Sequence, residues 1–260
     1  MKKFALKLNS KNVTNMLYPL LGIGLFVLIW FIVSTIVGVE MILPTPIQSL
    51  TKLFSLIGAK EFWLAVASTI GRALYGFAVS FALALLLAIL SYIVKPIEKV
   101  LNPIIVILRA VPTMSIILLA LIWMKSATAP ILIAFLILFP QLYASFLSAL
   151  NGINRELIDM SKVFKVPVYK RIIGLYIPEA LPSTLDAMRA NVSLSVKVTI
   201  AGEVLAQTYN SMGVSMQISK MYLDTGELLA WTIMAIVLSY LLEGVFALIK
   251  YFVMRGKYEN

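Results

Sequence analysis

Long apolar runs alternate with short polar segments along the chain, and six of these runs are long enough to cross a lipid bilayer. A helix needs about 20 mostly apolar residues to cross the hydrocarbon core, whereas barrel strands alternate in polarity over about 10 residues. The pattern therefore predicts an all-α membrane protein, folded as one transmembrane domain over residues 1–260. The six predicted transmembrane helices cover about residues 16–37, 69–94, 103–124, 129–150, 183–205 and 228–253.

Prolines interrupt the helical pattern at defined places. Pro44 and Pro46 follow the first run, where they break the helix and favour extended backbone. Residues 48–67 are then mixed in polarity, which predicts a partly amphipathic helix at the membrane interface. Pro112 lies inside the third run, and we expect it to bend that helix rather than to mark a binding site.

Composition excludes several classes of protein. Apolar residues make up 61% of the chain and charged residues 13%, which is not the balance of a soluble or a disordered chain. Cysteine is absent, so there is no disulfide framework and no thiolate chemistry. Histidine is absent too, which excludes a Ser-His-Asp triad and any zinc or haem site built on histidine. We therefore predict no catalytic residue and no metal site.

The basic residues predict the orientation in the membrane. The net charge is +10, which would favour nucleic-acid binding in a soluble protein but in a membrane protein indicates basic cytoplasmic loops. With the N-terminus inside, the cytoplasmic segments hold 14 Lys and Arg residues and the outer segments hold 5. The chain is thus predicted to be a multi-pass cell-membrane protein with both termini in the cytoplasm and no nucleic-acid partner.

The segment 151–182 is too polar to cross the membrane and too regular to be a simple loop. Leu157, Met160 and Phe164 have helical spacing, while Asp159 and Lys162 lie on other sides of the same short helix, which Pro167 ends. A short amphipathic helix between the fourth and fifth runs suits insertion into the groove of a partner protein. It suits equally a helix that lies on the lipid surface.

Charged residues inside the fifth run give the clearest indications of a site. Asp186, Arg189, Ser193 and Lys197 fall within roughly 80° of arc on a helix, and Lys197 lies about 21 Å from Ser183. The stripe could line a translocation path, and a cationic path suits an anionic solute. In the structural alternative, Asp186 pairs with Arg189 and Lys197 extends toward the interface.

Two more charged residues admit two roles each. Glu203, near the outer end of the fifth run, either shapes an outer gate or receives the solute, or it pairs with an outer lysine or sits at the interface. Arg109, about 9 Å past Pro103, extends to cytoplasmic phosphates or meets the segment 151–182.

The stretch 155–205 resembles the cytoplasmic loop and following helix of permease subunits of binding-protein-dependent ABC importers, and most closely the nitrate/sulfonate/taurine branch. In that family the loop has a Glu-Ala-Ala start, a later glycine and a Pro-x-x-x-Pro element. The resemblance covers about residues 43–216 in consistent order. The matching positions are Asp159-Met160-Ser161, Lys165, Pro178 and Pro182, supported by Leu43–Pro46, Arg109–Pro112, Gly202–Leu205 and Gly213.

The resemblance implies an importer of the type I fold with a coupling helix between spans four and five. It implies two permease copies, a dimer of ABC ATPase subunits that holds ATP and Mg, and an outer substrate-binding protein. This chain has no GxxxxGK[ST] loop, so it would be a non-catalytic subunit without a cofactor of its own. The implied ATPase-coupling residues are Glu156, Leu157, Asp159, Met160, Ser161, Lys162, Val163, Phe164 and Lys165, and the candidate path residues are Arg189, Ser193, Lys197 and Glu203.

The resemblance favours a sulfonate, nitrate or taurine-like anion as the solute, with a thiamine-pyrimidine precursor or riboflavin as the alternative. Two departures from the family pattern concern the geometry of the backbone, since Lys165 and Ala187 stand where the family has glycines.

Two other classes of protein compete with the ABC permease as interpretations of the sequence. A secondary transporter would show an inverted repeat and carboxylates in mid-span, whereas we find no repeat and most carboxylates lie at the span ends. A membrane-embedded enzyme would lack the usual nucleophile and base pairs, which leaves only a site based on aspartate for that class.

Overall fold

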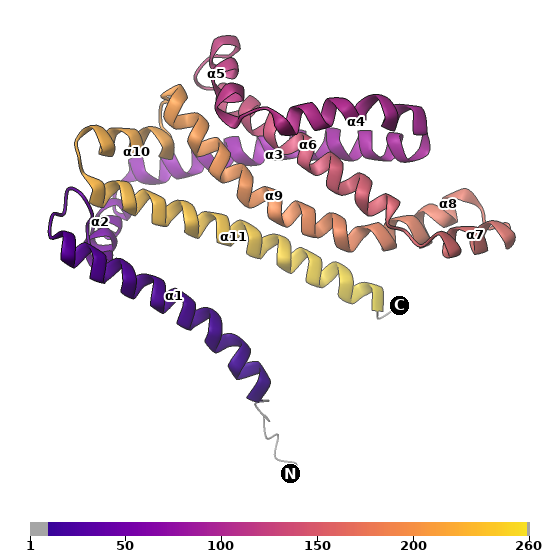
Figure 1. The fold of residues 1–260 in the computed structure, drawn as a ribbon, viewed down its shortest axis with the longest axis horizontal. Helices are drawn as coiled ribbons and strands as arrows, with labels where there is room; N and C mark the ends of the chain where they lie inside the picture. Colours follow the sequence, from indigo (N-terminus) through magenta and orange to yellow (C-terminus); the bar gives the residue numbers. More distant parts are fainter. Residues whose placement is uncertain (1–9, 259–260) are drawn as a thin grey trace.

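The computed structural model describes residues 10–258, and within them the chain is helical with no strand. This agrees with the all-α prediction (Figure 1). The basic tail with Lys2, Lys3 and Lys7 lies outside the described residues. The helices are α1 (Ser10–Val37), α2 (Pro46–Ile57), α3 (Lys60–Ile93), α4 (Lys95–Ala110), α5 (Thr113–Trp123), α6 (Ala129–Asn151), α7 (Arg155–Val163), α8 (Val168–Arg171), α9 (Ile177–Ala206), α10 (Met212–Met221) and α11 (Thr225–Tyr258), with a π-helical turn at Ile172–Tyr176.

Four of the described helices are long and apolar enough to cross a membrane, namely α1, α3, α6 and α11. The pair α4 and α5 would add a fifth crossing if the two helices form one broken span. Helix α9 is 30 residues long but does not qualify by composition, because it carries five charged residues. The predicted number of six spans therefore stays a prediction.

The segment 48–67 is not the single interfacial helix that the sequence predicted. Its first part is α2, and its second part belongs to α3, which begins nine residues before the predicted second span. Thr45 starts α2 with a capping box, in which its hydroxyl accepts from the Gln48 N–H at 3.3 Å and its own N–H donates to Gln48 Oε1 at 2.7 Å. Helix α2 ends at Gly58, so the chain turns before the long apolar helix begins.

The predicted third span, 103–124, is not one continuous helix. The bend expected at Pro112 is a full break, and α4 and α5 meet at an angle of 97°. Val111 and Pro112 both have extended ψ angles, near 130°, which helical backbone cannot adopt. Pro112 also has no N–H to donate to the preceding turn. The fifth helix differs as well, because α9 begins at Ile177 and includes Pro182, which the sequence had placed in the loop 151–182.

The core lies where α6 packs between α3 and α9. Gly76 lets α3 approach α6 closely, since a Cβ there would lie 2.8 Å from the Cβ of Ala134. In the same interface the buried Tyr143 hydroxyl on α6 donates to Ser91 Oγ on α3 at 2.8 Å. These contacts fix the rotation of α6 against α3, and hence the direction of the polar side chains on α6.

Helix α1 runs away from the other helices toward its N-terminal end (Figure 1), and its apolar side chains are exposed. The chain after it is tied to the start of α11. Lys52 of α2 binds Asp224 at 2.6 Å, and Thr225 Oγ1 donates to the Glu40 carbonyl at 2.7 Å. The hydrogen bond from Lys52 holds the pKa of the Asp224 carboxyl below its ordinary value, and Asp224 raises the pKa of Lys52.

Candidate functional site

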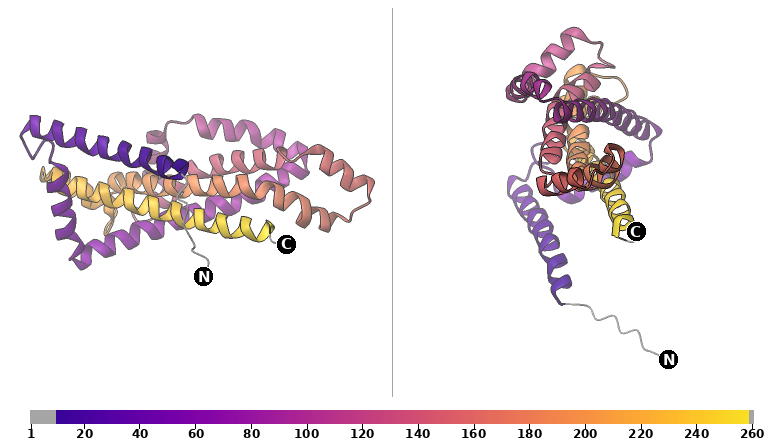
Figure 2. Two further views of the ribbon diagram at one scale, coloured as in Figure 1. Left: turned by 90° about the horizontal axis from the view of Figure 1, so that it is seen from below. Right: turned by 90° about the vertical axis from the view of Figure 1, so that its right-hand side faces the viewer.

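Helix α7 forms an exposed apolar surface at one end of the molecule. Figures 1 and 2 show α7 and α8 at the opposite end from α2 and α10. Asn154 caps α7, because its Oδ1 accepts from the Glu156 N–H at 2.9 Å. Val163 and Phe164 are 77% and 74% exposed, and Met160 is also exposed. A helix of this length with large apolar side chains in the open is incomplete without a partner or a lipid surface.

The predicted coupling helix 156–164 agrees within one residue with α7, while its role in binding an ATPase stays a prediction. Asp159 and Lys162 form the exposed ion pair of this helix, with 2.9 Å between Oδ1 and Nζ. Ser161 Oγ donates to the Ile158 carbonyl at 2.6 Å, and Leu157 is exposed as well. The apolar and charged residues predicted for coupling thus lie on one short element.

Lys165 adopts the conformation that a glycine adopts most easily. Its φ is +52°, in the left-handed region. Its N–H donates to the Lys162 carbonyl at 2.9 Å, and the next N–H, of Val166, donates to the Ser161 carbonyl at 2.9 Å. These two bonds make the helix-ending motif in which glycine is most common. The departure noted in the sequence therefore puts a side chain into a strained turn without changing the fold of the turn.

We expect Lys165→Gly to stabilise this turn by about 0.5–1 kcal/mol. Relief of the left-handed conformation is worth about 1–2 kcal/mol, and the extra freedom of glycine in the unfolded chain costs about 0.5–1 kcal/mol. Hydrogen exchange at the Lys165 and Val166 amides should slow. Lys162→Gly is the matched control and should speed exchange, because Lys162 is helical. Faster exchange in Lys165→Gly would contradict the strain.

The predicted stripe on α9 lies against α11. Ser193 and Lys197 line a cavity of about 410 Å³, and Arg189 Nη2 lies 3.9 Å from Glu243 Oε2 beside it. The pair of Asp186 with Arg189, which the structural alternative required, is wrong. Asp186 instead accepts from Lys250 at 2.6 Å, because α11 runs alongside α9 and presents its own charges.

Glu203 lies elsewhere, fully buried between α3, α9 and α10. Its carboxylate accepts from Thr69 Oγ1 and Arg72 Nη1, both at 2.8 Å, and from the Gly213 N–H at 3.2 Å. The prediction that Glu203 pairs with an outer lysine is wrong, because its cationic partner is Arg72. Gly213 is required here, since a Cβ would lie 2.5 Å from Glu203 Cβ. The four predicted path residues are therefore not gathered in one place.

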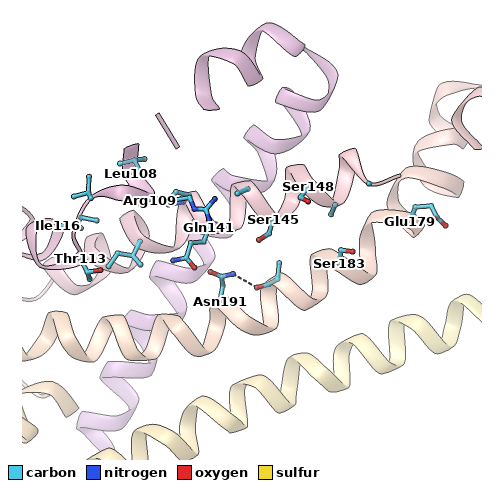
Figure 3. Close-up of a pocket in the computed structure, with 17 residues that line it drawn as sticks. Leu108, Arg109, Thr113, Ile116, Gln141, Ser145, Ser148, Glu179, Ser183 and Asn191 are labelled. Carbon is cyan, nitrogen blue, oxygen red and sulfur yellow. Dashed lines mark hydrogen bonds between the residues drawn. The ribbon is translucent and has the colours of Figure 1, made fainter. Parts of the chain in front are cut away.

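A larger cavity that the sequence did not predict lies between the α4–α5 break, α6 and α9. Its volume is about 950 Å³, and Arg109, Gln141 and Asn191 converge at one end of it (Figure 3). Arg109 lines this cavity together with Gly152 and Glu179 of the segment 151–182, and its two predicted roles stay predictions. Gln141 and Asn191 were missed, although a polar amide within an apolar run was a usable signal.

The described residues contain no group of three or more acidic side chains that could hold a metal ion. The groups that these cavities offer to a ligand are side chains that form hydrogen bonds and side chains with an unpaired positive charge.

Comparisons with known proteins agree with this arrangement. The sequence profile of the family described as "Binding-protein-dependent transport system inner membrane component" matches residues 80–255. The putative aliphatic sulfonates transport permease SsuC of Bacillus subtilis is 24% identical over 91% of this chain and 87% of its own length. The taurine permease TauC of Escherichia coli is 24% identical over 83% of this chain and 80% of its own length. The formylaminopyrimidine permease ThiX of Halalkalibacterium halodurans is 24% identical over 73% of this chain and 76% of its own length.

A solved structure of the MetNI methionine ABC transporter, described as inward facing, contains a chain with the same fold. The TM-score is 0.63 and the identity is 18%, over 74% of this chain and 97% of that chain.

Proposed function

Because the chain belongs to the family of binding-protein-dependent transport system inner membrane components, it is a permease subunit of an ABC importer, and we propose that two copies of it form the membrane path for a small anionic solute. In this proposal a dimer of ABC ATPase subunits binds the cytoplasmic face and supplies ATP hydrolysis with Mg. A substrate-binding protein delivers the solute from outside. The permease itself carries out no chemical step.

The exposed apolar surface of α7 is the observation that carries the proposal. Met160, Val163 and Phe164 are large apolar side chains on a nine-residue helix, and none of them is buried in the chain's own core. A groove on the ATPase would cover them, with Asp159 and Lys162 at its rim. We place this end of the molecule, and both termini, in the cytoplasm. We count six crossings by including α9 and the broken pair α4–α5.

The positive charges favour an anion. Arg109 and Lys197 each line a cavity, and neither has a hydrogen-bond or ion-pair partner among the side chains of residues 17–255. Two relatives are named for sulfonate and taurine transport, which supports a sulfonate, nitrate or taurine-like solute. The relative named for formylaminopyrimidine transport supports a thiamine-pyrimidine precursor as the alternative solute. Riboflavin is the other alternative solute.

Reconstitution of the full transporter tests the proposal. We expect the intact detergent complex to contain two permease copies and two ATPase subunits by mass. In vesicles, uptake of the solute that the outer binding protein binds should require ATP and survive dissipation of ion gradients. Uptake that follows an ion gradient without an ATPase would instead indicate a secondary transporter.

A further inference from the structure

Three polar side chains from three separate helices meet in the middle of the molecule. Gln141 lies about 18 Å from the start of α6, and Asn191 about 21 Å from the start of α9, at 1.5 Å per residue. Arg109 is in the last turn of α4, directly before the 97° break. Figure 3 shows the three side chains facing the same end of the larger cavity. Arg109 is exposed, Gln141 is half-buried and Asn191 is buried, and a buried polar group at this depth is costly unless something binds it.

The amide of Asn191 is oriented by the chain and has an unused acceptor. Asn191 is 6% exposed, and its Nδ2 donates to the Ala187 carbonyl at 2.9 Å. This bond fixes which end of the amide faces the cavity. Its Oδ1 is buried and has no hydrogen-bond partner among the described residues. A buried acceptor in that state requires an N–H or O–H group from whatever occupies the cavity.

The same end of the cavity attracts negative charge. The Arg109 guanidinium has no acidic or hydrogen-bonding partner among the side chains described, those of residues 17–255. The break at Pro112 also brings the first turn of α5 to the cavity wall, where Thr113 lines it, and the N-terminal end of a helix favours an anion. The acidic residue of the lining, Glu179, is about 18 Å away along α9 from Asn191.

We propose that this cavity binds the transported solute within the membrane, and that the solute carries an oxoanion next to a hydrogen-bond donor. Arg109 binds the sulfonate or carboxylate, and Asn191 Oδ1 accepts from the neighbouring ammonium or hydroxyl group. The cavity continues along α6 and α9 past Ser145, Ser148 and Ser183 toward α7, which provides a polar route to the cytoplasmic end. This inference rests on the proposed transport function. It adds the cavity that binds the solute and the hydrogen-bond donor that the solute carries next to its oxoanion.

Binding of labelled taurine and of ethanesulfonate to the purified permease–ATPase complex, without the binding protein, tests the proposal. Taurine has both a sulfonate and an ammonium group, whereas ethanesulfonate lacks the donor. We expect Arg109→Gln to weaken both ligands by about tenfold or more, since it removes a charge-assisted contact. Asn191→Ala should weaken taurine alone. Arg109→Lys should retain part of the affinity.

Two matched controls separate this effect from general damage. Lys99→Gln removes the same charge from the same helix, and Ser195→Ala removes a buried polar group from α9; neither residue lines the cavity, so both should bind taurine normally. The mass of the Arg109→Gln complex should still show two permease copies. Loss of the second copy would mean that Arg109 binds the other subunit, which overturns the proposal.

Three further results would overturn it. The first is a wild-type complex that binds neither ligand, and the second is unchanged binding in both Arg109→Gln and Asn191→Ala. The third is weaker binding in Lys197→Ala with unchanged binding in Arg109→Gln, which would place the solute in the cavity beside α11. In each case ATPase association and ATP-dependent uptake, measured on the same preparation, report separately on the proposed transport function.

Discussion

Replacement of Phe164 by alanine is expected to weaken the complex with the ATPase and to uncouple ATP hydrolysis from uptake. Phe164 is 74% exposed at the end of α7, so its ring is available for burial in a partner. Burying a phenylalanine side chain is worth about 1.5–3 kcal/mol, which corresponds to roughly 10- to 150-fold in affinity. The dissociation constant of the purified subunits and the ATP consumed per solute transported would measure both effects.

Lys162→Ala is the matched control on the same helix. Lys162 forms an exposed ion pair with Asp159, and such pairs contribute about 0–1 kcal/mol. It should therefore change the dissociation constant little. The reverse order, a large effect of Lys162→Ala and none of Phe164→Ala, would mean that charge holds the subunits together. If neither variant has an effect, α7 lies on lipid instead.

Removal of the Glu203 carboxylate is expected to cause the largest loss of stability. Glu203→Ala leaves Arg72, which is mostly buried, without its partner, and it leaves the Thr69 hydroxyl and the Gly213 N–H without their acceptor. Breaking a buried ion pair from one side costs about 3–5 kcal/mol. Unfolding in detergent, followed by the loss of helical signal, should show this decrease in the free energy of unfolding.

A double variant separates a structural role from a transport role. Arg72→Met combined with Glu203→Leu removes both charges and should recover part of the lost stability, because no unpaired charge stays buried. If Glu203→Ala leaves stability unchanged but abolishes uptake, Glu203 acts in a gate and the structural role is wrong.

Local signals were sufficient for the features that depend on neighbouring residues. The apolar runs predicted a helical membrane protein, because each run must satisfy its backbone groups within its own helix. The short helix 156–164 was predicted to within one residue, because its apolar spacing and Pro167 act within two turns. The glycine position at Lys165 was identified from the resemblance, and the structure shows its left-handed backbone.

The partners of the charged residues could not be predicted in the same way. Asp186 and Arg189 are three residues apart, which suggested a pair, yet each binds a residue of α11 more than 50 positions away. Glu203 binds Arg72 of α3, 131 residues distant. Pro112 predicted a bend but not the 97° break, whose size depends on how α5 packs against α6.

The sequence by itself determined the helical class, the short helix between the fourth and fifth apolar runs and the absence of histidine and cysteine chemistry. The tertiary structure decided which faces of those helices meet. Close approach of α3 and α6 at Gly76 sets the rotation of α6, and the packing of α4 and α9 around α6 brings Arg109 and Asn191 to the cavity that Gln141 lines. Helical periodicity specifies which residues share a face, but only contacts between distant segments specify what that face meets.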